Sequence, residues 1–417
     1  MLTNFRPIRS LSLDFSRSAS GNGPWTVLLG ENGTGKSSIL QALALTLMGE
    51  EQRRRLMPDA SRNLRHGARV GSVEVYLAGS TEPLVLRFRK GLKDFEAPNA
   101  EPALLLGYGS TRLPSRDATT PAQTNEAAVR VDNLFDPLLP ITDPTQWLMS
   151  LDDELFDRVS GWLGQLLAFE RSRRLVRDRA AGTVELRAGR SRSTLAELSD
   201  GYQSMLILAC DVMRTLLPLW KNNLEQAEGI VLIDELGTHL HPRWRMRIVA
   251  ALRGVLPRVQ FVATTHDPLC LRGLEDGEVT VLRRNEKQDV ISFSDLPSVK
   301  GLRVEQLLAS DFFGLGSTRD PQVDDLYDEY YRLRSRRRLS QKGQTRLARI
   351  EKDLMELDRL GTTEQERLVF RAAGDYIAQR RASGDDDREE HPRDDDIRQE
   401  LLELWSAVLP SPEDEIG

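Results

Sequence analysis

The chain has 417 residues, of which 40% are hydrophobic, so about two or three domains with buried cores are possible. The formal net charge of -6 at pH 7 argues against a surface coated with nucleic acid, and no run of about 18 apolar residues that could span a membrane is present. The N-terminus lacks a signal-peptide pattern, and Cys210 and Cys270 both lie in apolar stretches. We therefore expect a soluble cytoplasmic protein with buried thiols and no membrane partner.

Residues 1–29 predict an edge β-hairpin and a turn into a core strand, and a glycine-rich loop and a helix follow. The loop at residues 30–37, GENGTGKS, matches the pattern G-x-x-x-x-G-K-[S/T] completely. Its glycines let backbone N–H groups turn toward a polyphosphate at the positive end of the helix, and Gly49 is placed to end that helix. Lys36 brings a charge to the β- and γ-phosphates, and the Ser37 hydroxyl suits Mg²⁺. The stretch predicts a nucleoside triphosphate site that is contacted by Asn32, Gly33, Thr34, Gly35, Lys36, Ser37 and Ser38.

Residues 1–112 are expected to form the first lobe of the nucleotide-binding domain. Residues 73–88 predict a second hairpin and residues 103–106 another core strand. Between the helix and this hairpin lies a segment rich in arginine, with Arg53, Arg54, Arg55, Arg62, Arg65 and Arg69. It is either a solvated linker or a surface for phosphate or nucleic acid.

Residues 113–197 are expected to form an inserted loop and small helical lobe. Small and polar residues dominate residues 113–125, which predicts a mobile loop. Apolar residues recur every four positions within residues 143–174, which predicts a helix, and residues 183–186 are strand-like.

The second half of the nucleotide-binding domain is predicted at residues 198–318. Ser199 and Gly201 begin an apolar helix, and Ser199 has the residue type of a helix N-cap. A buried strand at residues 229–233 then ends in Asp234 and Glu235. Two carboxylates at a strand's C-terminal end suit a metal site and water activation, so we assign Asp234 to the metal, with Ser37, and Glu235 to the catalytic base.

Histidines complete this predicted site. The next strand, residues 259–265, leads to His266, which is placed to hydrogen-bond a γ-phosphate or the attacking water. Together with Glu235 and Lys36 it forms the predicted catalytic set. His239 and His241 have a spacing that suits a metal, but without a third ligand nearby we expect a structural or dimer-contact role.

The order of these motifs resembles the ATP-binding-cassette (ABC) ATPase superfamily, in which residues 198–203, LSDGYQ, would be the signature sequence. Residues 4–6, NFR, resemble the opening of its soluble SMC/RecF-like branch. Residues 234–242 and 260–268, with Tyr108, Gly109 and Arg112 and with residues 304–314, resemble the OLD-like group that includes the PtuA-like ATPases of Septu anti-phage systems.

This resemblance implies an α/β fold of the ABC-type P-loop NTPase, with a mixed central sheet, a small helical lobe insertion and a helical C-terminal extension. It implies ATP and Mg²⁺ as cofactors and adds Arg6 to the nucleotide contacts. It also implies a homodimer or a higher even-numbered oligomer, in which Lys36 and Ser37 of one subunit face Ser199 and Gly201 of another.

The sequence departs from the superfamily pattern at several positions. Gly237 stands where relatives usually have an acid, Asp267 where they have Ser, and Asp200 where transporters have Gly. The glutamine that usually precedes the helical lobe has no clear counterpart. The first two departures affect either the rate of hydrolysis or the contacts between subunits.

The C-terminal part is predicted to be a helical extension at residues 319–382, followed by an acidic linker and a terminal amphipathic helix at residues 383–417. Helical spacing at residues 323–333 and 347–357 predicts a hairpin, and Thr363 to Glu366 is a capping box that opens another helix. Arg334 and residues 336–338 form a basic cluster, either solvated or a contact for nucleic acid or a partner. The terminal helix either folds back or docks on another protein.

We expect a soluble ATP hydrolase that dimerises on Mg-ATP and regulates a separate effector, a nuclease or toxin in anti-phage defence, because the sequence shows no second catalytic constellation. The alternative is a RecF/SMC-like ATPase that acts in DNA repair or senses DNA structure, which residues 4–6 and the arginine-rich segments motivate. The motor of a membrane transporter is disfavoured by the resemblance to the soluble branch.

Overall fold

The structure is a computed structural model that describes residues 1–17, 24–99, 101–112, 130–167, 169, 173–189, 191–335 and 339–357. It divides into two compact units, Met1–Leu315 and Gly316–Gly417. The predicted loop at 113–125, the arginines at 336–338, the capping box at 363–366 and the acidic and amphipathic segments from 383 lie outside the described residues.

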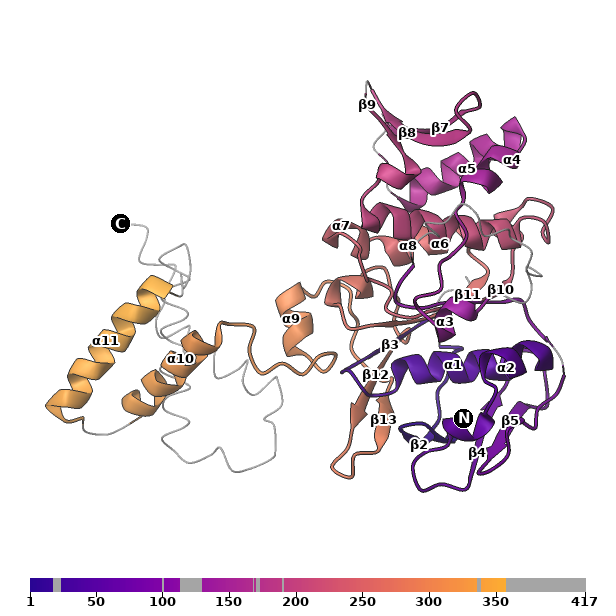
Figure 1. Cartoon of the computed structure of the whole chain (residues 1–417). Coiled ribbons are helices and arrows are strands. Elements are labelled where there is room, and N and C mark those ends of the chain that lie inside the picture. Colours follow the sequence, from indigo (N-terminus) through magenta and orange to yellow (C-terminus); the bar gives the residue numbers. More distant parts are fainter. Residues whose placement is uncertain are drawn as a thin grey trace, which may run out of the picture. The chain divides into compact units, whose positions relative to one another are not determined.

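The central sheet of the first unit has the strand order β13-β12-β3-β11-β10-β6 (Figure 1). All neighbouring strands run parallel except β12 and β13, so the predicted mixed sheet is confirmed. The strands are β3 (Trp25–Gly30), β6 (Leu105–Tyr108), β10 (Gly229–Ile233), β11 (Val259–Thr265), β12 (Val279–Arg284) and β13 (Val290–Phe293).

A second sheet, antiparallel, has the order β2-β1-β4-β5 and contains both predicted hairpins. Its strands are β1 (Leu2–Phe5), β2 (Ile8–Leu11), β4 (Val70–Val75) and β5 (Leu84–Arg89). A third antiparallel sheet belongs to the inserted lobe and consists of β7 (Arg173–Asp178), β8 (Thr183–Ala188) and β9 (Ser191–Thr194).

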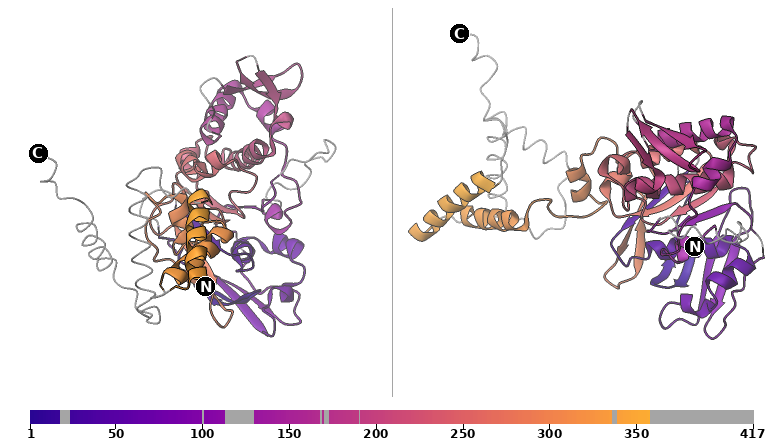
Figure 2. Two further views of the ribbon diagram at one scale, coloured as in Figure 1. Left: turned by 90° about the vertical axis from the view of Figure 1, so that its left-hand side faces the viewer. Right: turned by 45° about the horizontal axis from the view of Figure 1, so that its top comes forward.

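Helices separate these sheets into layers within the first unit. Helix α1 lies between the central and the second sheet, and α6 and α8 cover the other face of the central sheet, below the inserted lobe (Figures 1 and 2). The helices of this unit are α1 (Lys36–Leu47), α2 (Glu50–Leu56), α3 (Asp132–Phe135), α4 (Thr145–Ser150), α5 (Asp153–Leu166), α6 (Asp200–Leu216), α7 (Pro242–Arg245), α8 (Ile248–Val255) and α9 (Val304–Ala309). Short 3₁₀ turns are η1 (Ala60–Asn63), η3 (Leu195–Glu197), η4 (Leu224–Gln226) and η5 (Pro268–Leu271).

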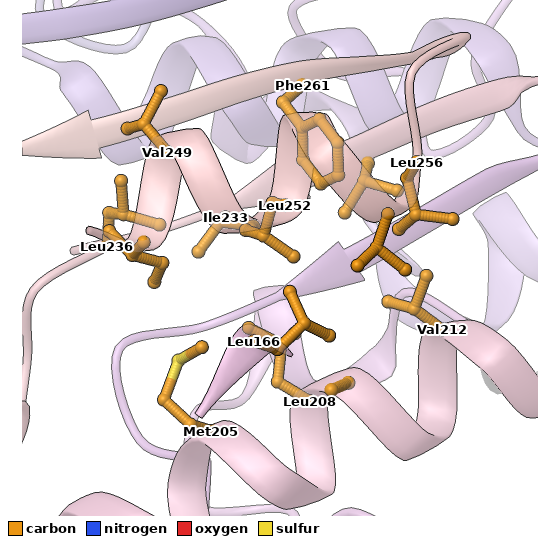
Figure 3. Close-up of a cluster of buried hydrophobic side chains, with 14 of the residues drawn as sticks. Leu166, Met205, Leu208, Val212, Ile233, Leu236, Val249, Leu252, Leu256 and Phe261 are labelled. Carbon is orange, nitrogen blue, oxygen red and sulfur yellow. The ribbon is translucent and has the colours of Figure 1, made fainter. Parts of the chain in front are cut away.

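The central sheet has a hydrophobic core on each face. Successive side chains of a strand point to opposite faces, so Trp25, Val27 and Leu29 of β3 pack in one core while Leu28 packs in the other. The first core joins α5, α6 and α8 to β10 and β11, and Figure 3 shows their side chains converging on one another. Burial on both faces explains why the parallel strands are nearly continuous apolar runs in the sequence.

The prediction of one helix within residues 143–174 is wrong in its extent. The chain breaks between α4 and α5, where Leu151 is extended and the Asp152 side chain accepts a hydrogen bond of 2.8 Å from the Leu155 N–H. An aspartate at this position caps a new helix rather than continuing the old one. The end of the predicted helix, from Arg173 on, is strand β7, which pairs with β8 along its whole length.

Gly49 does not end α1 as expected. Helix α1 ends at Leu47 with an extended Met48 as its C-cap, and Gly49 has a φ of -66° and is the N-cap of α2. The connection between α1 and α2 therefore contains no glycine in the left-handed conformation.

The described part of the second unit is a helical hairpin of α10 (Pro321–Arg334) and α11 (Gln341–Leu357), which confirms the predicted one. Tyr327, Leu333, Ile350 and Leu354 form its small buried core.

Candidate active site

The glycine-rich loop joins β3 to α1 in a conformation that favours glycine. Gly33 and Gly35 have φ values of 82° and 90°, in the left-handed region, and Gly35 is the N-cap of α1 without any side-chain cap. The first N–H groups of α1 are thus left for a ligand, and the helix dipole favours an anion there. The loop residues predicted to bind nucleotide lie together at this helix N-terminus.

Lys36 lies inside the loop and is only 5% exposed. Its Nζ donates hydrogen bonds to the carbonyl oxygens of Gly30, at 2.7 Å, and of Glu31, at 3.1 Å. Burial lowers the pKa of Lys36, an effect that the nearby Glu235 and Asp234 carboxylates partly oppose. A phosphate placed beside this ammonium would stabilise its charged form.

Asp234 and Glu235 follow β10 at the C-terminal edge of the parallel sheet. Ile233 pairs with Ala263 of β11, which brings Thr264 next to the acid pair. The Thr264 hydroxyl donates to Asp234 Oδ1 at 2.6 Å and accepts from the Glu235 N–H at 2.8 Å. Thr264 thus holds both acids, although the sequence analysis assigned it no role; the register of the two strands is the signal that points to it.

Glu235 and His266 contact each other at the end of two neighbouring strands. Glu235 Oε2 lies 2.7 Å from His266 Nδ1. The side chain of Glu235 is 20% exposed and that of His266 67% exposed, so both reach solvent at the edge of the sheet. The Glu235 backbone has a φ of 51°, a conformation that a glutamate rarely adopts. The predicted base and the predicted histidine therefore form one unit.

Two arginines that the sequence analysis did not assign to the site also reach it. Arg112 is fully buried and binds backbone carbonyls on both sides of Glu235. Arg284, at the end of β12, donates to the Gly33 carbonyl oxygen at 2.7 Å. Arg284 lies in no motif, and Arg112 belongs to a stretch that resembles the OLD-like group but had no expected role in the site. Contacts between distant segments make both arginines part of it.

Arg6 is engaged within the first unit. Its Nε donates to Asn63 Oδ1 at 3.2 Å, its Nη1 binds Gln41 Oε1 on α1, and its guanidinium lies 5.3 Å from the ring centre of Phe5. Burial lowers the pKa of Arg6. The expected contact between Arg6 and nucleotide stays a prediction.

The predicted signature residues begin helix α6. Ser199 is its exposed N-cap, and Gly201 is buried so tightly that a Cβ atom there would lie 2.5 Å from the His239 carbonyl oxygen. The rings of Tyr202 and Trp244 meet edge to face at 4.0 Å. The start of α6 therefore packs against the segment that follows the acid pair.

Of the two histidines with the i, i+2 spacing, His241 makes a structural side-chain contact, and the backbone carbonyl oxygen of His239 faces Gly201. His241 Nδ1 accepts a hydrogen bond from the Arg243 N–H at the N-terminus of α7. Over the parts of the chain that the structure describes, no group of three His, Cys, Asp or Glu side chains could hold a metal ion.

Gly237 and Asp267, which depart from the superfamily pattern, both make close contacts with neighbouring residues. A Cβ atom on Gly237 would lie 2.6 Å from Cys270 Sγ, so the position has no room for an acid. Asp267 caps η5 by accepting from the Leu269 N–H at 2.8 Å, and it forms an ion pair with Arg245 of α7.

Magnesium would fit the donors that are present. Asp234 and Ser37 would supply hard oxygen ligands, which Mg²⁺ prefers, and among the described residues no group of three acids or histidines could complete the shell. Phosphate oxygens and water would have to provide the remaining ligands, as is usual for Mg²⁺ bound with a nucleotide.

The arginine-rich segment at residues 53–69 is largely committed to intramolecular contacts. Arg53 is buried and donates to the carbonyl oxygens at the end of α1. Arg54, Arg55, Arg62 and Arg65 form ion pairs with acids of the first unit. The segment is therefore part of the packed first unit rather than the solvated linker that the sequence suggested, and a contact with phosphate or nucleic acid stays a prediction.

The fold and the site define a P-loop nucleotide-binding domain of the ATPase class. The chain belongs to the family described as "AAA domain, putative AbiEii toxin, Type IV TA system", whose profile matches residues 25–272.

Curated relatives agree with this assignment. The chain is 41% identical to the Septu protein PtuA of Bacillus mycoides (strain KBAB4) over 381 residues, which are 91% of this chain and 53% of that protein. It is 32% identical to the Septu protein PtuA of Bacillus thuringiensis over 141 residues, 32% of this chain and 35% of that protein. It is 36% identical to the Retron Vc95 probable ATPase of Vibrio cholerae over 95 residues, 22% of this chain and 18% of that protein. The resemblance to PtuA-like ATPases is confirmed, and the chain spans about half or less of the length of these relatives.

Among solved structures, an SMC head bound to the C-terminal winged-helix domain of ScpA has a TM-score of 0.42 and 15% identity, covering 70% of this chain and 96% of that one. None of the helices in the described ranges combines the length and the apolar character needed to cross a membrane.

Proposed function

We propose that this chain hydrolyses ATP with Mg²⁺ and acts as the ATPase of an anti-phage defence system. The observation that carries the proposal is that Asp234 and Glu235 lie near enough to Lys36, at the N-terminus of α1, for their charges to oppose the burial that lowers its pKa. His266 contacts Glu235 at the same edge of the sheet. The similarity to Septu PtuA proteins and to a retron probable ATPase supports the same activity and the same biological setting.

In this proposal each residue has a separate task. The N–H groups of the glycine-rich loop and the Lys36 ammonium bind and orient the phosphates. Asp234 and Ser37 would hold Mg²⁺, which when bound neutralises charge on the phosphate oxygens. Glu235 accepts a proton from the attacking water, and His266, 2.7 Å from Glu235, keeps the carboxylate in place and contacts the γ-phosphate or the water.

We further propose that two copies close over two nucleotides and that this closure regulates an effector, a nuclease or toxin. Support comes from Ser199, which is exposed at the start of a 17-residue helix and makes no side-chain capping bond there. Its hydroxyl is available for a phosphate held by another subunit. One motive for the DNA-sensing alternative is weaker, because the arginines of residues 53–65 already bind groups of the first unit.

The Glu235→Gln variant tests the hydrolysis. It should bind ATP with unchanged affinity, because the loop and the metal ligands remain, and lose about 100-fold or more of its turnover, because the base is lost. Phosphate release and calorimetric titration with ATP measure the two effects. The matched control is Glu228→Gln, an exposed acid paired with Arg258, which should leave turnover unchanged.

The same variant tests dimerisation, since it traps bound ATP. Sedimentation of Glu235→Gln should show a dimer with Mg-ATP and a smaller species without it, and Ser199→Arg should prevent the shift. Wild-type turnover in Glu235→Gln would remove Glu235 as the base, and sedimentation unaffected by ATP would contradict nucleotide-driven closure.

A further inference from the structure

Arg112 is a fully buried guanidinium at the edge of the sheet next to the acid pair. It follows β6 closely, and β6 pairs in parallel with β10, which leads into Asp234 and Glu235. Burial lowers the pKa of Arg112 to about 10, against the opposing influence of Asp234, Cys270 and Glu235. At neutral pH this buried side chain is charged.

The hydrogen bonds of Arg112 converge on the backbone around Glu235. Nη1 donates to the Asp234 carbonyl oxygen at 2.9 Å, and Nη2 to those of Glu235, at 3.2 Å, and Leu236, at 3.4 Å. Three consecutive carbonyls can face one guanidinium only because the chain turns sharply there. The planar fork of arginine, with its fixed donors, suits such a set.

That turn contains the left-handed Glu235. A non-glycine residue persists at a φ of 51° only where its surroundings determine it. Arg112 holds the carbonyl side of this turn, whereas the side chain and the backbone carbonyl of Thr264 hold the N–H groups of Glu235 and Leu236, both at 2.8 Å. The direction of the Glu235 side chain follows from this backbone conformation.

The support for Arg112 comes from the segment that leads into the inserted lobe. Arg112 Nη1 also donates to the Gly109 carbonyl oxygen at 2.9 Å. Asn133 accepts from the Gly109 N–H at 2.7 Å and donates to the carbonyl oxygens of Thr111, at 3.0 Å, and Leu139, at 2.7 Å. A continuous set of hydrogen bonds therefore runs from residue 139 to the Glu235 backbone.

We infer that Arg112 is a positioning residue for hydrolysis: it holds Glu235 in the left-handed conformation that aims the carboxylate at the attacking water, with Asn133 fixing Arg112 from the lobe side. This inference rests on the proposed function, because it requires Glu235 to be the base. Arg112 itself need not touch nucleotide.

The Arg112→Lys variant of the full chain tests the inference, since it keeps the charge and loses the fork. It should lower kcat by about 10- to 100-fold, because a small displacement of a catalytic group has effects of that size. The affinity for ATP should stay within about threefold, because the phosphate cradle is intact. In the Glu235→Gln background the same substitution should cause no further loss of kcat, since residues that act through one group are not additive.

Arg53→Lys is the matched control, because Arg53 is also buried, at 2% exposed, and also donates to backbone carbonyls, those of Leu45, at 2.8 Å, and Met48, at 2.6 Å. It should lose stability and keep its kcat. Urea unfolding of each variant separates the folded fraction from the turnover of the folded protein. If Arg112→Lys does not fold, Asn133→Ala takes its place. This variant should likewise have a lower kcat and an almost unchanged affinity for ATP.

The outcomes are distinguishable. If Glu235→Gln hydrolyses ATP like the wild type, the proposed function fails. If Glu235→Gln is inactive but Arg112→Lys keeps its kcat, or loses no more than Arg53→Lys, the inference alone is overturned. A further loss of kcat in the double variant would also overturn it, because Arg112 would then act on something other than Glu235.

Discussion

At the residue scale, the positions of the proposed catalytic residues depend on hydrogen bonds from smaller neighbouring side chains. Thr264 is the clearest case: its single hydroxyl donates to the proposed metal ligand, Asp234, and accepts from the N–H of the proposed base, Glu235. It is fully buried, so water cannot replace either bond.

Replacing Thr264 by Val should therefore lower both activity and stability. Valine has the same shape without the hydroxyl, which leaves a buried carboxylate oxygen and an N–H without their partner and should cost about 1–3 kcal/mol in the free energy of unfolding. Thr264→Ser keeps the hydroxyl and should retain most of the turnover. Urea unfolding and phosphate release measure the two effects, and equal activity of the Val and Ser variants would contradict the assigned role.

Gly237 gives a second prediction at this scale. Its missing Cβ makes room for Cys270, so Gly237→Ala should destabilise the protein by about 1–3 kcal/mol through overpacking. Adding Cys270→Ala should relieve the clash, so that the double variant is less destabilised than the sum of the two single ones. Strict additivity in a double-mutant cycle would show that the sulfur is not the obstacle.

At the element scale, the strands of the parallel sheet could be predicted closely. Strand β10 is a continuous apolar run after Gly229, and β11 is apolar except for Gln260 and its last two threonines, because both faces of the sheet are buried. Polar residues follow where the strands end at the site. Because these two strands run parallel and end at the same edge of the sheet, the sequence also predicted that Asp234, Glu235 and His266 lie together at that edge. Arg112 and Thr264 lie in stretches that carry the family resemblance, but their roles and that of Arg284 could not be predicted, since each arises through a contact with a segment distant in sequence.

The inserted lobe shows why periodicity alone was misleading. Apolar residues continue at helical spacing through Leu151, but Asp152 gives the backbone a capping bond that starts a new helix. Strands β7 and β9 are rich in Arg and Ser and lack the alternation that marks a half-buried strand. In the inserted lobe, a capping hydrogen bond and strand pairing therefore determine the secondary structure, although the apolar spacing predicts one helix.

Asp152 provides the prediction for this scale. Asp152→Ala should lower the free energy of unfolding by about 1 kcal/mol, because the first turn of α5 loses its side-chain acceptor. Asp152→Asn keeps an acceptor and is the control. Chemical denaturation monitored by circular dichroism compares the two, and equal stability of the Ala and Asn variants would mean that the cap contributes nothing.

At the scale of the whole molecule, the first unit contains every residue of the candidate site. Its two main cores are built from residues that precede the second unit, with Phe313 the last of them. The second unit has a small core of its own.

We therefore expect residues 1–315 to fold and to bind ATP with the affinity of the full chain. Cooperative thermal unfolding and calorimetric titration check the two statements. A fragment that aggregates, or that binds ATP more than about tenfold more weakly, would show that the second unit completes the first. The full chain carrying Lys36→Ala is the control for loss of binding by direct removal of a phosphate contact.

The order of the central sheet has a consequence during protein synthesis. Strand β3, which leads into the glycine-rich loop, pairs with β11 and β12 in the described part of the central sheet, and these end at Thr265 and Arg284. At translation rates of about 5–20 residues per second, the ribosome needs on the order of 10–50 s to make the intervening chain. Throughout that interval the loop has no sheet to anchor it, so a nascent polypeptide cannot capture ATP before most of the first unit has been made.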